Sequence, residues 1–217
     1  MAVYATSDWH GYMSIYNQIK KYINPDDKFY VLGDSGDRGP QGWECIKACL
    51  ADPQIIYLKG NHDDMTAKTI LGDHEAEHLS YYNGGYETIQ DWMSDGMDAS
   101  WGHKLQNLPT IGEYKNQEGQ DIYLCHAGFT IGTDVNDHEL VWDRKHIFDE
   151  PVDTNKIVIH GHTPVRSIRA VSVKDWYKPY WYANSTKCDI DMGTYRSGKA
   201  CLLNLDTWDY KIFNVKE

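Results

Sequence analysis

The sequence has no hydrophobic run long enough to cross a membrane, which takes about eighteen consecutive apolar residues. Its first residues, MAVYATSDWHGYM, lack the basic segment and apolar core of a secretory signal peptide. Positive charge is also scarce, because the formal net charge is −11. Non-specific binding to nucleic acid or to an anionic membrane needs clustered Lys and Arg, so neither partner is expected. We expect a cytoplasmic protein.

Cysteine spacing of the kind seen in disulfide frameworks or zinc sites is missing as well. The five cysteines are Cys45, Cys49, Cys125, Cys188 and Cys201. Cys45 and Cys49 lie four residues apart on one face of a predicted helix, where a free thiol packs as a small hydrophobic side chain. We expect reduced thiols, as is usual in the cytosol.

Short apolar runs alternate with helical patterns over the first part of the chain. Strands are predicted at residues 2–6, 29–32 and 55–58, with a helix near 13–23 and another beginning near Pro40. Strands joined by helices pair in parallel through right-handed crossovers, so the pattern predicts an α/β core. At 217 residues and 41% hydrophobic content, the chain suits one domain over residues 1–217.

The middle of the chain, at about 65–108, is polar, is broken by glycines and shows no strand pattern, which indicates a mainly helical excursion from the sheet. Strand patterns return near Ile122 and Ile157 and at 199–205 and 210–215. The last two are expected to form an antiparallel hairpin around Asp206.

Residues of the types that bind metals follow nearly every predicted strand. They are Asp8, His10, Asp34, Asp37, Asn61, His62, His126, His160 and His162. In an open parallel sheet, binding sites form outside the carboxyl ends of the strands. Adjacent strands lie about 4.8 Å apart, and paired hydrolytic metals lie about 3.5–4 Å apart. The sequence therefore predicts one metal site, although spacing alone does not choose between His160 and His162.

Two other stretches invite functional interpretations. HEAEH, residues 74–78, matches the zinc-protease pattern H-E-x-x-H, but no third ligand follows and an exposed charged helix turn is expected. The aromatic stretch 175–183 has two interpretations: it lines a substrate groove, or it packs in the core or on the surface.

The motifs SDWHG, GDSGDRG, GNHD, CHAG and GHTP, in that order, resemble those of the calcineurin-like metallophosphoesterases. The likeness is greatest to the bacterial and phage-lambda type of serine/threonine protein phosphatase, and it includes NGGY at 83–86 and LVWDR at 140–144. The resemblance implies a β-sandwich of mixed sheets flanked by helices (α/β/β/α), with a helical excursion at about 65–108. Ser7, Gly36 and Asp63 depart from the usual motifs without removing an expected ligand.

The resemblance also implies two divalent metal ions. One ion would be held by Asp8, His10 and Asp34. Asp34 would bridge to the other ion, which would be held also by Asn61, His126 and His162. Oxygen and imidazole ligands suit Mn²⁺, which we expect first, with Zn²⁺, iron or Mg²⁺ as alternatives.

For catalysis, the resemblance makes a metal-bridging hydroxide the nucleophile, His62 the general acid and Asp37 the group that orients it. Arg38 and Arg144 would bind the substrate phosphate, since arginine contacts two phosphate oxygens at once. An imidazole pKa of about 6.5 suits proton donation near neutral pH.

The predicted function is hydrolysis of phosphomonoesters, first of phosphoserine or phosphothreonine in proteins. A symmetrical bis(5'-nucleosyl)-tetraphosphatase, or another esterase for small phosphorylated molecules, is the alternative. A non-catalytic metal-binding interaction module is a third possibility, disfavoured because binding alone would require neither His62 nor the arginines.

Overall fold

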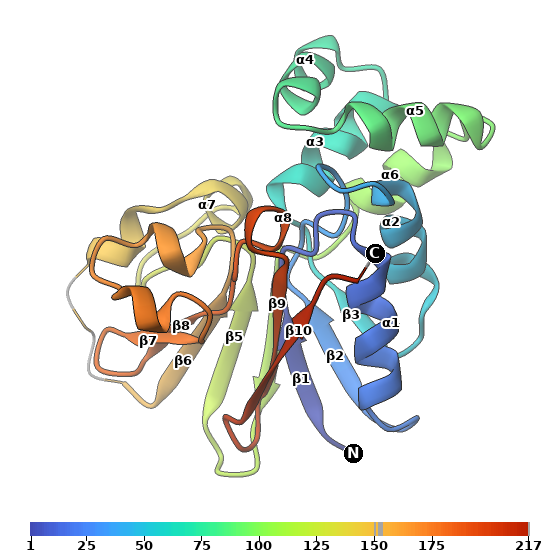
Figure 1. Ribbon diagram of the computed structural model, residues 1–217. Coiled ribbons are helices and arrows are strands. Elements are labelled where there is room, and N and C mark those ends of the chain that lie inside the picture. Colours follow the sequence, from blue (N-terminus) through green and yellow to red (C-terminus); the bar gives the residue numbers. More distant parts are fainter. Residues whose placement is uncertain (150, 152–153, 217) are drawn as a thin grey trace.

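The computed structural model describes residues 1–149, 151 and 154–216, and in it two five-stranded sheets face each other (Figure 1). The first sheet has the order β10-β9-β1-β2-β3. Its strands are β1 (Val3–Thr6), β2 (Lys28–Val31), β3 (Ile55–Tyr57), β9 (Lys199–Asn204) and β10 (Tyr210–Asn214). β1, β2 and β3 are parallel, and β9 and β10 form the expected antiparallel hairpin. The predicted strands of this sheet are confirmed.

The second sheet has the order β4-β5-β6-β8-β7. Its strands are β4 (Ile111–Lys115), β5 (Asp121–Cys125), β6 (Lys156–His160), β7 (Tyr180–Tyr182) and β8 (Lys187–Asp189). The sequence predicted β5 and β6 but missed the other three. β8 has only three residues and β4 is half-exposed, so neither carries an apolar run that stands out, and the three aromatic residues of β7 belong to the aromatic stretch 175–183.

Side-chain alternation divides the core into two layers. Val3 and Ala5 of β1 and Tyr30 of β2 point between the sheets, where they meet Ile122 and Ile159 of the second sheet. The intervening residues of the first sheet point to its outer face, against the helices. These layers match the sandwich flanked by helices that the motif resemblance implied.

Helices α1 (Met13–Tyr22) and α2 (Gly42–Ala51) cover the outer face of the first sheet. Ile15 and Ile19 of α1 and Trp43 and Ile46 of α2 are buried against it. The predicted helix near 13–23 and the one beginning near Pro40 are therefore confirmed.

The helical excursion stands above the ends of the strands (Figure 1). It consists of α3 (Asn61–Ile70), α4 (His74–Tyr82), α5 (Tyr86–Ser94) and α6 (Ser100–Gln106). It begins at Asn61, a few residues earlier than expected, because the chain enters α3 directly from the short segment after β3. This places Asn61 and His62 in the first helical turn.

Shorter elements complete the second half. They are α7 (Asp137–Trp142), η1 (Lys145–Phe148), η2 (Val165–Ser167), η3 (Val173–Asp175) and α8 (Thr194–Ser197). Among the described residues, no helix has the length and apolar character that a membrane crossing requires. All five cysteines are buried and free.

Candidate metal centre and phosphate pocket

The predicted ligands meet at the carboxyl ends of strands from both sheets. Asp8 and His10 follow β1, Asp34 follows β2 and Asn61 begins α3 after β3, while His126 and His162 follow β5 and β6 of the facing sheet. All six are at least 94% buried. The site therefore lies where the carboxyl ends of strands from the two sheets come together.

Asp34 is at the middle of this cluster. Its Oδ2 atom lies 3.4 Å from Nε2 of His126 and 3.9 Å from Nε2 of both His10 and His62. Asp34, His10 and His62 form one group whose potential ligand atoms lie within 4.8 Å of one another, and Asp34, Asp8 and His126 form another. Asp34 belongs to both groups, as expected of a carboxylate that two neighbouring metal ions would share.

The surroundings of His126 fit a cation. Its Nδ1 lies 2.7 Å from the carbonyl oxygen of Leu32, to which an Nδ1–H donates, so the neutral ring carries a lone pair on Nε2. That lone pair faces Oδ1 of Asn61 at 2.9 Å and Nδ1 of His162 at 3.1 Å. Three potential ligand atoms that face one another in this way fit a metal ion between them.

The charges agree with this interpretation. Burial lowers the pKa of His126, but the Asp34 carboxylate outweighs burial and raises it to about 9. Burial raises the pKa of Asp34, but positive charge on His126 and His62 outweighs burial and holds it well below its usual value. Nε2 of His162 has no hydrogen-bond partner among the described residues although it is buried. The residues present thus favour positive charge at this place.

Asp8 is fixed by two hydrogen bonds. The Ser7 hydroxyl donates to its Oδ2 at 2.5 Å, and the backbone N–H of His162 donates to the same atom at 3.0 Å. Ser7, which departs from the usual motif, therefore orients the carboxylate beside it.

The backbone at the site is held in an uncommon conformation. Left-handed φ values of 48° to 67° occur at Asp8, His10, Asp34, Asp37, Arg38 and His162. Each such non-glycine residue costs about 1–2 kcal/mol. Such conformations persist where the surroundings enforce them, and they concentrate at functional sites.

Glycine allows the close approaches beneath this cluster. A Cβ on Gly60 would collide with Oδ1 of Asp34, and one on Gly33 would lie 2.9 Å from Nδ1 of His126. Gly161 is similarly close to the Asp8 carboxylate. These positions explain why glycine stands beside nearly every predicted ligand.

His162, and not His160, joins the cluster. The side chain of His160 is buried elsewhere, with Nε2 2.7 Å from the hydroxyl of Tyr182. The spacing of GHGHTP left this choice open because both residues follow β6. Left-handed φ at His162 turns its side chain toward His126.

His62 and Asp37 lie together next to the ligands. Nδ1 of His62 donates to Oδ2 of Asp37 at 2.7 Å, which leaves Nε2 for a substrate. Burial lowers the pKa of His62, but the carboxylates of Asp34 and Asp37 outweigh it and raise the pKa. In this arrangement Arg38 donates to Nε2 of His62 and to Nε2 of His10, each at 2.7 Å. An arginine nitrogen can only donate, so each Nε2 atom accepts from Arg38 in the neutral form of its ring.

Asp63 is a site residue whose role sequence reasoning missed. Its Oδ2 accepts from the backbone N–H of Asp34 at 2.9 Å and of Gly60 at 2.8 Å, and its Oδ1 accepts from the hydroxyl of Tyr57. Burial and the Asp34 charge raise its pKa to about 6. Asp63 thus joins the loop after β2 to the start of α3.

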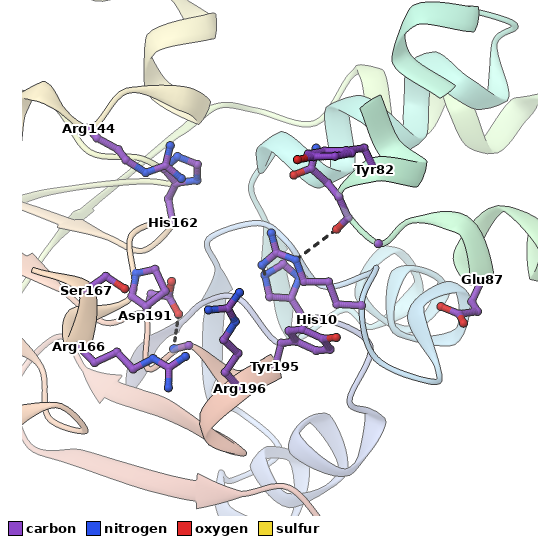
Figure 2. A pocket seen from close by; sticks show the side chains of 15 residues that line it. His10, Tyr82, Glu87, Arg144, His162, Arg166, Ser167, Asp191, Tyr195 and Arg196 are labelled. Atoms are coloured by element: carbon purple, nitrogen blue, oxygen red, sulfur yellow. Dashed lines mark hydrogen bonds between the residues drawn. The ribbon is translucent and has the colours of Figure 1, made fainter. Parts of the chain in front are cut away.

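A pocket of about 490 Å³ opens beside the cluster (Figure 2). His10, His162 and both predicted phosphate-binding arginines, Arg38 and Arg144, line it. Two further arginines also line the pocket, Arg166 in η2 and Arg196 in α8. The sequence motifs did not predict a role in phosphate binding for either. Neither belongs to a recognised motif, so no local pattern in the sequence identified them.

The other two candidate stretches lie outside this pocket. His74 has a 94% exposed side chain on α4 and contacts Glu77, as expected for an exposed helix turn. In the aromatic stretch, Trp181 of β7 packs against Trp208 with ring centroids 5.1 Å apart. None of residues 175–183 lines the pocket, and of the two interpretations of this stretch the packing one agrees with the structure.

The family model for calcineurin-like phosphoesterases matches residues 1–191. The chain belongs to the calcineurin-like phosphoesterase family. Membership places it among the hydrolases of phosphate esters, whose members use a dinuclear divalent metal centre.

Two curated relatives are named as bis(5'-nucleosyl)-tetraphosphatases. A symmetrical bis(5'-nucleosyl)-tetraphosphatase of Delftia acidovorans is 23% identical over 59% of this chain and 44% of its own length. The aligned part thus spans less than half of that relative. The asymmetrical bis(5'-nucleosyl)-tetraphosphatase PrpE of Anoxybacillus flavithermus is 24% identical over 83% of this chain and 77% of its own length.

A solved structure shares the fold. A putative diadenosine tetraphosphatase superposes with a TM-score of 0.67 at 13% identity, covering 99% of this chain and 94% of that one. At this identity the likeness concerns the fold alone.

Proposed function

We propose that this calcineurin-like phosphoesterase is a dinuclear metal-dependent hydrolase of phosphate esters. The observation that carries the proposal is the convergence of potential ligand atoms from both sheets around Asp34, next to the His62–Asp37 pair and two arginines. We assign the first metal to Asp8, His10 and Asp34. The second is assigned to Asp34, Asn61, His126 and His162, with Asp34 shared. When bound, two divalent ions supply Lewis acidity and an activated water for attack on phosphorus.

The protein's own groups account for the rest of the chemistry. Arg38 and Arg144 bind the phosphoryl oxygens, and a phosphate in the pocket competes with the two histidines for Arg38. When Arg38 turns to the phosphate, Nε2 of His62 becomes free to carry the proton that the leaving oxygen needs. Asp37 holds the ring and stabilises its charged form.

Two substrate classes have specific support. The order of the motifs and the residues LVWDR favour the phosphoserine or phosphothreonine of proteins. Both curated relatives carry names of enzymes that act on bis(5'-nucleosyl) tetraphosphates, which favours a dinucleotide at least as strongly.

The test is hydrolysis of p-nitrophenyl phosphate at neutral pH, with added Mn²⁺ and with a chelator. Activity that requires the metal is expected. Full activity in the chelator would contradict the dinuclear mechanism. Parallel assays with phosphoserine peptides and diadenosine tetraphosphate compare the two substrate classes.

A further inference from the structure

The arginines of this protein are distributed unevenly. The sequence has only five, and four of them line one pocket: Arg38, Arg144, Arg166 and Arg196. Lysine is more abundant in the chain, yet no lysine of the described residues lines this pocket. The planar guanidinium group binds phosphate oxygens in pairs, which an ammonium group does not do. In a chain of net charge −11, this concentration indicates a site for anions.

Arg166 and Arg196 are not engaged in structural ion pairs. Among the described residues, no carboxylate lies within ion-pair distance of either guanidinium group, and neither group donates a hydrogen bond to a protein atom. Within the described part of the chain, two acidic residues line the pocket. Glu87 is on its far side from Arg166 (Figure 2), and an oxygen of Asp191 accepts from the N–H of Gly193 at 2.6 Å. Positive charge is therefore in excess in the pocket.

The four arginines fall into two groups. Arg144 reaches the pocket beside His162, and Arg38 contacts His10 and His62 next to the candidate ligands. Arg166 and Arg196 come from below Asp191 and His10 in Figure 2, one from η2 and one from α8. A phosphoryl group held by the first pair at the metals leaves the second pair for another anion.

We propose that Arg166 and Arg196 form a second anion subsite, which binds a further phosphoryl group of a phosphoanhydride chain whose reacting phosphorus lies at the metal centre. This inference rests on the proposed function and selects oligophosphates, such as nucleoside polyphosphates, as the preferred substrate class. A cavity of about 490 Å³ has the size of small-ligand sites in general. Tyr82 and Tyr195 on its rim, with 88% and 47% exposure, offer faces on which a nucleobase can stack.

Spacing favours an anhydride chain over a second phosphoserine. Successive phosphorus atoms of an oligophosphate are separated by a single bridging oxygen. Neighbouring residues of an extended peptide advance about 3.3–3.6 Å, and side chains on the same side are about twice that far apart. One compact pocket with four arginines therefore suits the denser charge of the anhydride.

The decisive experiment compares kcat/KM for diadenosine tetraphosphate with kcat/KM for p-nitrophenyl phosphate, with Mn²⁺ in excess over all phosphate groups. The variants are Arg166→Gln, Arg196→Gln and, as the matched control, Arg169→Gln. Arg169 is an exposed arginine three residues after Arg166 and outside the pocket lining. We expect the ratio to fall about tenfold or more in the first two variants, because each loses a charge-assisted hydrogen bond, and to stay within about twofold in the control. An unchanged ratio in both pocket variants would overturn the subsite.

A binding measurement separates failure of the subsite from failure of the proposed function. Inorganic triphosphate is titrated into the protein in the presence of a chelator and monitored by calorimetry, with inorganic phosphate for comparison. We expect triphosphate to bind about tenfold or more tightly than phosphate, and expect Arg166→Gln and Arg196→Gln to remove that preference. If the wild-type protein hydrolyses no phosphate ester, this titration still decides the subsite. Equal binding of the two anions would overturn it.

A comparison of phosphopeptides tests whether the subsite accepts a second phosphoserine. Peptides with one and with two phosphoserines are assayed under the same conditions. The proposal expects little gain from the second phosphoserine. A tenfold gain that Arg166→Gln abolishes, without a matching effect on diadenosine tetraphosphate, would overturn the assignment to a phosphoanhydride chain.

Discussion

The Nδ1 atom of His62 lies 2.7 Å from Oδ2 of Asp37, and both side chains are buried. The bond fixes which nitrogen of His62 faces the pocket, and the two neighbouring residues of that loop, Asp37 and Arg38, both have left-handed φ. Strained backbone in this loop thus accompanies the placement of an imidazole next to the candidate ligands.

Replacing His62 by Asn is expected to slow hydrolysis of an alkyl phosphate by about 10²–10⁴-fold, because an alkoxide leaves only when it is protonated. Hydrolysis of p-nitrophenyl phosphate should slow much less, since its phenolate leaves without a proton. Steady-state kinetics on both substrates make the comparison, with His103→Asn, an exposed histidine on α6, as control. Equal losses on both substrates would argue against a general-acid role.

Asp34→Asn should abolish both metal binding and catalysis. Asp34 belongs to both groups of converging potential ligand atoms, and the proposed assignment shares its carboxylate between the two metals. Substitutions behind the ligands already cost about 10–100-fold in metal affinity or activity, so loss of a shared ligand is expected to exceed 100-fold. Metal content by elemental analysis and phosphate release provide the readouts.

The exposed His74→Ala is the matched control for Asp34→Asn and should behave as wild type. A loss in His74→Ala would revive the zinc-protease interpretation of HEAEH. Unchanged metal content in Asp34→Asn would refute the site assignment.

Gly60→Ala should disturb the metal site without straining the local backbone. Gly60 has φ of −99°, which any residue adopts, but its new Cβ would collide with the Asp34 carboxylate. We expect weaker metal binding together with lower stability. Gly119→Ala is the contrasting variant, because Gly119 has φ of +81° and open space around it. It should cost about 1 kcal/mol of stability and leave metal binding unchanged. Similar metal affinities in both variants would contradict the steric argument.

Acidification should destabilise the protein partly through His146. Burial and the positive charge of Lys187 lower its pKa to about 4, against about 6.5 in the unfolded chain. Between these values the unfolded state binds the proton and the folded state does not, so stability is lost as the pH falls from 6.5 to 4. The full loss from this residue is about 3 kcal/mol.

Urea unfolding of the protein in a chelator, at several pH values between 4 and 7, measures this effect. His146→Gln should reduce the pH dependence by about one proton, whereas the exposed His74→Gln should not change it. Buried His10, His160 and His162, whose pKa values burial also lowers, keep part of the dependence in every variant. Identical slopes for His146→Gln and wild type would contradict the prediction.

The sequence by itself determined the α/β core and the composition of the candidate site. Strands β1, β2, β3, β5 and β6 carry apolar runs that end in polar residues, and the motif order identifies those residues through local patterns a few residues long. Such local patterns can be recognised in a sequence because backbone periodicity and turn chemistry depend on residues close together in the chain.

Only the tertiary structure decided what depends on residues far apart in the chain. It turned His162 toward His126 and His160 toward Tyr182, a choice that the spacing H-G-H left open and that only the motif resemblance had made for His162. It also brought Arg166 and Arg196 to the pocket that Arg38 and Arg144 share. Such placements result from the packing of two sheets against each other, and no periodicity within one segment encodes them.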